Sequence, residues 1–126
     1  MGDGGGSRPP RKHSDRKRKL RNLHLPTLFD LQQGICALCG LDMQHLWFAD
    51  LDHFAPKGDG GSDELGNLSA MHSGCNRHKS SRDVAVVRDQ AEREGVPVDR
   101  AAAHEALCIA LSAGLKAPWD NNGDAA

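Results

Sequence analysis

Apolar residues are spaced unevenly along the 126-residue chain, and their pattern predicts short elements separated by loops. Residues 1–22 are rich in Gly, Pro and basic residues and have almost no apolar side chains, so we expect them to be disordered. The pattern that follows predicts a helix from Pro26 to about Gly34. A strand-like composition predicts a short hairpin over residues 44–54, and a further helix should begin near Cys75.

Two more helices are predicted in the C-terminal part of the chain. Asp83 is placed to cap the first and Asp99 to cap the second, and a glycine closes each. Cys108 falls on the apolar stripe of the second helix, so we expect it to be buried. The chain then divides into a basic arm (residues 1–22), one folded domain (23–115) and a flexible tail (116–126). Within the domain, the core motif spans residues 34–82 and the C-terminal helices span about 83–113.

The composition indicates a thin core. Only 38% of the residues are hydrophobic and 4% are aromatic, and small domains bury a low fraction of their surface. Something besides apolar burial should therefore stabilise the fold. The sequence contains no apolar run long enough for a membrane span and no secretory signal, so we expect an intracellular, cytoplasmic protein. Four cysteines in a reducing compartment point to metal binding or reactivity more than to disulfides.

The net charge of −1 conceals a strong asymmetry. Residues 1–25 hold eight of the 16 Lys and Arg and two of the 17 Asp and Glu, which gives +6 there and −7 over the rest. A basic arm on an acidic body is the pattern expected of a protein that engages polyanions such as nucleic acid. The alternative is a solubilising tail.

Two similarly spaced pairs of residues predict a zinc site. Cys36 and Cys39 have the spacing of a knuckle that presents two thiolates to one tetrahedral ion, and His72 and Cys75 repeat it. Because His78 follows Cys75 at the same distance, it competes with His72 as the fourth ligand. A redox-active pair is the alternative, but no thioredoxin-like pattern surrounds these cysteines. A structural zinc would supply the stabilisation that the core lacks.

Further residues follow these pairs in a fixed order: Asp52-His53-x-x-Pro56, Gly60-Gly61, Asn67-Leu68, Cys75-Asn76 and Lys79. In this ordered set residues 34–82 resemble the HNH endonuclease family. The resemblance implies a small α+β protein with the ββα-metal fold, held by structural zinc and flanked by helices. His72 stands where the family usually has Cys. Asn76 stands where many members have His, as in the H-N-N variant, whose enzymes are active.

The resemblance implies metal-dependent cleavage of DNA. An imidazole, with an unperturbed pKa of about 6.5, suits proton abstraction from water, so we expect His53 to be the general base. The family pattern implies that Asn67 orients this imidazole. Asp52 and Asn76 would supply oxygen ligands to Mg²⁺ or Mn²⁺, which would stabilise the leaving oxygen. Basic residues near the site are expected to hold flanking phosphates: Lys57, Arg77, Lys79 and Arg82.

DNA is therefore the expected partner. We expect the protein to be a nuclease encoded by a bacterium, a phage or a mobile element. The alternative is a non-catalytic zinc-stabilised nucleic-acid-binding module, and a zinc-held protein-interaction domain is a further one. A pure binding module has no need of the combined set of Asp52, His53, Asn67 and Asn76.

Overall fold

The computed structural model describes residues 12–56 and 60–115, so the predicted tail and the first eleven residues of the predicted arm lie outside the described part. Its elements are, in chain order, α2 (Lys12–Leu31), η1 (Leu46–Phe48), β1 (Ala49–His53), β2 (Leu68–His72), α3 (Ser73–Lys79), α4 (Val84–Arg93), α5 (Arg100–Ser112) and η3 (Ala113–Leu115). The mixed α and β class predicted from the sequence is confirmed. Among the described residues, no helix combines the length and apolar character that crossing a bilayer requires.

Strands β1 and β2 form a two-stranded antiparallel sheet in which Asp52 faces Ser69 and His53 faces Leu68. The predicted hairpin over residues 44–54 is wrong, because β1 pairs with a strand that follows a long loop. The residues before β1 wind into the η1 turn, where the ring of His45 accepts a hydrogen bond from the Trp47 amide. That bond caps the turn, which leads directly into β1.

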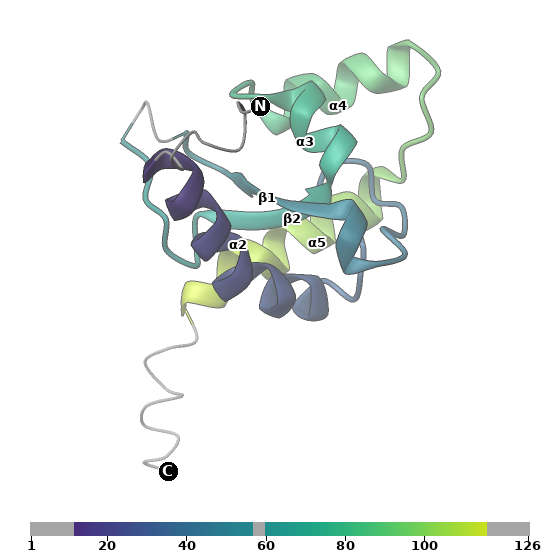
Figure 1. The fold of residues 1–126 in the computed structure, drawn as a ribbon. Coiled ribbons are helices and arrows are strands. Elements are labelled where there is room, and N and C mark those ends of the chain that lie inside the picture. Colours follow the sequence, from purple (N-terminus) through teal and green to yellow (C-terminus); the bar gives the residue numbers. More distant parts are fainter. Residues whose placement is uncertain (1–11, 57–59, 116–126) are drawn as a thin grey trace, which may run out of the picture.

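Helix α2 packs against both strands (Figure 1). The expected disorder is wrong for residues 12–22, which are helical, and Pro26 lies inside the helix instead of at its start. Leu25 and Leu28 are buried in the core, and Leu20 packs against the same core one or two turns earlier. Lys and Arg favour helix formation, so a basic segment with an anchored end extends the helix. The helix could not be predicted from the sequence of the arm, because Leu20 is the one apolar residue among the many charged ones of residues 12–22.

The two C-terminal helices begin as predicted. The carboxylate of Asp83 accepts from the Ala85 amide at 2.8 Å, and that of Asp99 accepts from the Ala102 amide at 3.1 Å. Cys108 is exposed, which contradicts the expected burial. The inner face of α5 is made by small residues and Leu107, and Cys108 comes one residue later, so it is turned by about 100° away from that face.

The core is small, and buried polar side chains complete it. Its largest fully buried side chains are Leu28, Met43, Leu68, Met71, Val87, Cys36 and Ser69. Gln32 is 2% exposed, and its amide both donates to the Ala70 carbonyl (2.9 Å) and accepts from the Ala70 amide (2.8 Å). The side chain of Gln32 therefore pairs with the second edge of β2 as a neighbouring strand would.

Candidate functional site

The two predicted pairs of zinc ligands come together at one place. Cys36 and Cys39 lie in the turn after α2, and His72 and Cys75 lie where β2 passes into α3. Their ligand atoms are all within 4.8 Å of one another. His78 is exposed on α3 and does not belong to this cluster. We refer to the four residues as the Cys₃His cluster.

The geometry of the cluster fits a tetrahedral zinc ion. Nδ1 of His72 lies 3.4 Å from Sγ of Cys39 and 3.7 Å from Sγ of Cys75. Zinc–ligand distances of about 2.3 Å to sulfur and about 2.0–2.1 Å to nitrogen give a tetrahedral S···N edge of roughly 3.6 Å. Nε2 of His72 is 3.3 Å from the Asp42 carbonyl. A hydrogen bond to that carbonyl puts the proton on Nε2 and leaves the lone pair of Nδ1 directed at the thiols.

Hydrogen bonds to sulfur prepare the cluster for a cation. Sγ of Cys36 accepts from the backbone amides of Leu38 and His72, both at 3.3 Å. The pKa of Cys36 is lowered, first by hydrogen bonds from the thiols of Cys39 and Cys75 and then by backbone amides. The same contacts with Cys36 raise the pKa of Cys39 and that of Cys75. Without a cation, only one of the three neighbouring sulfurs is favoured as a thiolate. A divalent ion would stabilise all three as thiolates, because each would bind it.

Helices α4 and α5 hold the turn that carries Cys36 and Cys39. Arg88 is 5% exposed, and its guanidinium donates to the carbonyls of Ala37 and Leu38 at 2.9 and 3.0 Å. Gly40 has a φ of 78°, and a Cβ there would lie 2.1 Å from the carbonyl oxygen of Asp99. Only glycine allows this close approach of the turn to the start of α5.

A cavity of about 360 Å³ lies at the end of β1, and we call it the β1 cavity. It brings together three residues that the sequence predicted as catalytic, namely Asp52, His53 and Asn76. Adjacent strand residues point to opposite faces, yet Asp52 and His53 both line this cavity, as do Asp50 and Leu51 before them on β1. The other lining residues come from α2, β1 and the loops: Arg16, Lys17, Leu20, Arg21, Asp50, Leu51, Pro56, Asp63, Ser80 and Ser81.

Asp52 is held in a buried ion pair with Lys79. Nζ of Lys79 lies 3.1 Å from each carboxylate oxygen, and the residues are 6% and 2% exposed. Burial raises the pKa of Asp52, and the positive charge of Lys79 opposes that rise. The prediction that Lys79 contacts DNA is therefore wrong, because its ammonium group is enclosed and neutralised by a carboxylate.

The amide of Asn76 is oriented by the strand it faces. Its Nδ2 donates to the Leu51 carbonyl at 3.2 Å. The amide oxygen is then the group that Asn76 has left to offer a cation. Asn76 lines the β1 cavity with Asp52, and carboxylate and amide oxygens are ligands that hard cations such as Mg²⁺ or Mn²⁺ prefer.

The imidazole of His53 contacts Asp63, which sequence reasoning missed. Nε2 of His53 lies 2.8 Å from Oδ1 of Asp63. The expected contact between Asn67 and His53 is not what the structure shows, since the Asn67 amide bonds to the backbone of Ala55 and Ser62 instead. These bonds close the loop between the strands and bring Asp63 back to the end of β1.

Gly61 makes the closed loop possible. A Cβ at this position would lie 1.7 Å from the carbonyl oxygen of Ala55, so no other residue fits without movement of the backbone. The sequence signal that could have placed Asp63 near His53 was therefore the Gly60-Gly61 pair together with Asn67. These residues mark a loop that closes back on the end of β1.

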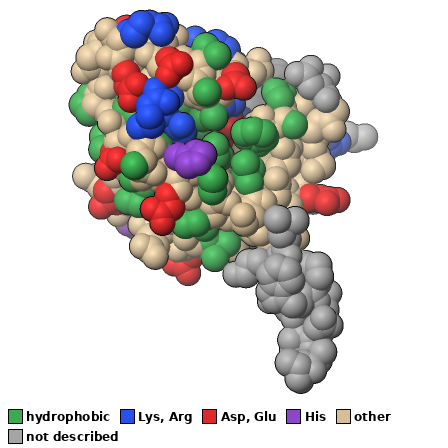
Figure 2. Space-filling view, turned by 180° about the vertical axis from the view of Figure 1, so that it is seen from behind, with side chains coloured by type: hydrophobic (Ala, Val, Ile, Leu, Met, Phe, Trp, Pro, Cys, Tyr) green, Lys and Arg blue, Asp and Glu red, His purple; other side chains and the backbone are tan. Residues whose placement is uncertain are grey.

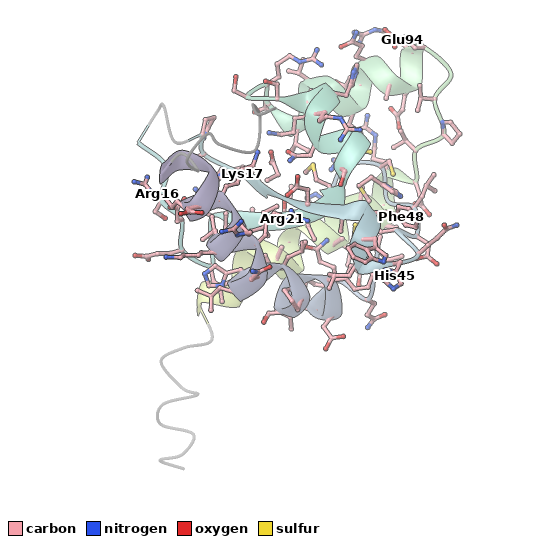
Figure 3. All side chains as sticks on the ribbon, viewed as in Figure 1. Arg16, Lys17, Arg21, His45, Phe48 and Glu94 are labelled. Carbon is pink, nitrogen blue, oxygen red and sulfur yellow. The ribbon has the colours of Figure 1, made fainter. Side chains whose placement is uncertain are left out.

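Basic side chains of α2 replace those expected on α3. Arg16, Lys17 and Arg21 line the β1 cavity, and Figure 3 shows Arg21 over the sheet. The opposite face of the molecule intersperses acidic and basic side chains (Figure 2). Arg77 and Arg82 are exposed but do not line the β1 cavity, and Arg82 also donates to the carbonyls of His78 and Lys79. Their contact with DNA stays a prediction. Lys57 lies outside the described residues.

Comparison with known proteins adds one finding to this geometry. The family model of the HNH endonucleases matches residues 36–82, the segment that contains the Cys₃His cluster, both strands and α3. The resemblance of this segment to the HNH family is thus confirmed, and the match indicates a nuclease or nucleic-acid-binding function. No curated protein and no solved structure matches the chain.

Proposed function

We propose that the protein is a metal-dependent endonuclease that hydrolyses DNA phosphodiester bonds. The observation that carries the proposal is the β1 cavity, in which an imidazole, a carboxylate and an amide oxygen lie together beside basic side chains. Unpaired cysteines are typical of reducing compartments, so the proposal places this activity inside the cell.

His53 is the general base in this proposal. The carboxylate of Asp63 accepts a hydrogen bond from the protonated Nε2, so Nδ1 keeps the lone pair that takes a proton from water. Asp63 fixes the tautomer and the orientation of the ring and is a positioning residue. The side chain of His53 is 24% exposed, so water reaches it from the cavity.

Asp52 and Asn76 would hold the divalent cation. When bound, such an ion polarises the scissile phosphate and stabilises the leaving oxygen. Lys79 contacts both oxygens of the buried Asp52 carboxylate, so its charge opposes the rise in the pKa of Asp52 and the contact fixes the orientation of the carboxylate. Because both groups are buried, removing either one would leave an unpaired buried charge and destabilise the protein. Lys79 therefore has a structural role at the site.

The Cys₃His cluster is the structural zinc site in this proposal, with His72 as fourth ligand. It joins the end of α2 to the start of α3, and α3 carries Asn76. Bound zinc would therefore fix the start of α3, and with it Asn76, against the turn after α2 and the end of β2.

Cleavage of a supercoiled plasmid tests the proposed activity. Zinc-loaded protein should convert supercoiled DNA to nicked or linear forms when Mg²⁺ or Mn²⁺ is added, and should not do so with zinc alone. Gel electrophoresis over a time course reads the conversion. If the protein binds the plasmid but never cuts it with either ion, the non-catalytic binding module becomes the better interpretation.

The basic side chains of α2 should contribute to DNA affinity. A variant with Arg16→Ala and Lys17→Ala removes two charges that line the β1 cavity, and alanine preserves the helix. We expect the slope of log K against log salt to become shallower by up to about 0.9 for each lost phosphate contact. Fluorescence anisotropy of a labelled DNA at several salt concentrations gives the slope.

The matched control changes Arg18 and Lys19 to alanine. This variant loses the same charge from the same helix, at two exposed positions that do not line the cavity. Equal slopes for the two variants would show that the salt dependence of DNA binding reflects the net charge of α2 alone. Lining the β1 cavity would then give Arg16 and Lys17 no special role. Deletion of residues 1–22 is a poorer test, because it would cut α2 in the middle.

A further inference from the structure

A second cavity, also of about 360 Å³, adjoins the β1 cavity at Arg21. Arg21 is the side chain that the two cavities share. The other lining residues come from α2 and from the η1 turn: Asn22, Leu25, Pro26, His45, Leu46 and Trp47. We call it the aromatic cavity. In Figure 3, Arg21 lies between Lys17 and the turn that carries His45 and Phe48.

Trp47 is the most exposed large hydrophobic residue of the described part, at 80%. The turn nevertheless fixes its position. Its backbone amide donates to Nδ1 of His45 at 3.1 Å, and the two rings stack with centroids 6.2 Å apart and an interplanar angle of 24°. Tryptophan is usually mostly buried, so a fixed and open indole beside a charged cavity indicates a surface for a flat ligand.

We infer that the aromatic cavity binds an unpaired nucleobase of the DNA strand that the β1 cavity cleaves, with Trp47 as the stacking surface. The inference rests on the proposed function for its substrate. Every base has a π-face, so stacking on an aromatic side chain tolerates any sequence. Inside a duplex the neighbouring base pairs cover these faces, so away from the duplex ends only an unpaired base can present one.

Arg21 connects the two cavities along the path of such a strand. Its side chain is 42% exposed, and its Nε is 3.3 Å from Oδ1 of Asp50 without the geometry of a hydrogen bond. The ion pair with Asp50 holds the guanidinium where the two cavities meet, and although Nε is buried, the exposed part of this side chain can contact the phosphate between the stacked base and the scissile phosphate. The substrate class that follows is DNA with unpaired nucleotides next to the cleaved bond, in preference to intact duplex.

Tryptophan fluorescence tests the inference directly. The chain has two tryptophans, so Trp119→Phe leaves Trp47 as the single reporter. Zinc-loaded protein of this background, with no Mg²⁺ or Mn²⁺, is titrated with a 16-nucleotide oligothymidylate and with a 16-base-pair duplex. We expect the single strand to quench Trp47 and the duplex to quench it weakly, because stacking requires a free base.

Substitution of Trp47 then measures the contribution of stacking to affinity. Trp47→Ala should raise the Kd for the labelled single strand by roughly 5- to 150-fold and leave the Kd for the duplex nearly unchanged. Trp47→Phe should retain most of the affinity. Phe48→Ala is the matched control, since Phe48 is 53% exposed in the same turn but does not line the aromatic cavity.

An unchanged Kd for the single strand in Trp47→Ala, or equal losses for single strand and duplex, would overturn the inference and leave the surface to a protein partner. Neither readout requires cleavage. A protein that fails to nick plasmid but shows the single-strand quenching contradicts the nuclease proposal alone. A protein that cuts DNA while Trp47→Ala binds single strands normally contradicts this inference alone.

Discussion

Removal of zinc should unfold the protein. We expect about one zinc ion per chain, and chelation should abolish the helical circular dichroism signal and the cooperative thermal transition. Structural zinc sites contribute about 10–16 kcal/mol in small zinc-dependent peptides, which is as large as the total stability of about 5–15 kcal/mol that folded domains have. The small core described above makes this contribution decisive, because few large side chains are buried.

Paired substitutions distinguish ligands from other residues of the same type. Cys36→Ala should lose zinc and structure together, whereas Cys108→Ala should lose neither, since Cys108 is exposed and outside the cluster. His72→Ala should likewise cost far more stability than His78→Ala. Metal analysis and thermal denaturation of the four variants give the ranking. Folded protein without zinc, or a larger loss in His78→Ala, would contradict the assignment.

The Cys₃His cluster could be predicted because its geometry is local. Two residues between ligands fix each pair on one turn of backbone, so spacing alone brings Cys36 next to Cys39 and His72 next to Cys75. The caps of α4 and α5 were predictable for the same reason, since an Asp side chain binds an amide only two or three residues away. The choice between His72 and His78 required the fold, which shows the first beside the thiols.

Contacts across the fold were not visible in the sequence. Asp63 reaches His53 through a loop whose closure depends on backbone bonds, and Lys79 looks like a surface charge until its burial against Asp52 is seen. Helix α3 has only seven residues, too few for a periodic pattern to separate an inner from an outer face. The helical arm was missed because its anchor, Leu20, is one apolar residue among many charges.

Replacement of His53 should separate catalysis from folding. A well-placed general base contributes roughly 10²–10⁴-fold, so His53→Ala should slow plasmid nicking by about that factor. The zinc cluster and the ion pair of Asp52 with Lys79 do not involve His53, so zinc content, circular dichroism and DNA affinity should persist. His78→Ala is the matched control, an exposed histidine that does not line the β1 cavity, and should cut at the parental rate.

Asp63→Asn extends the same experiment to the positioning of the base. An amide can donate a hydrogen bond where the carboxylate only accepts, so it allows the tautomer in which Nε2 of His53 carries the lone pair and Nδ1 the proton. We expect nicking to slow by about tenfold or more, with less effect than His53→Ala and no additional loss in the double variant. Nicking rates of the two single variants and the double variant, each beside its circular dichroism spectrum, decide the matter. If folded His53→Ala cuts as fast as the parent, another group takes the proton and the role of Asp63 falls with that of His53.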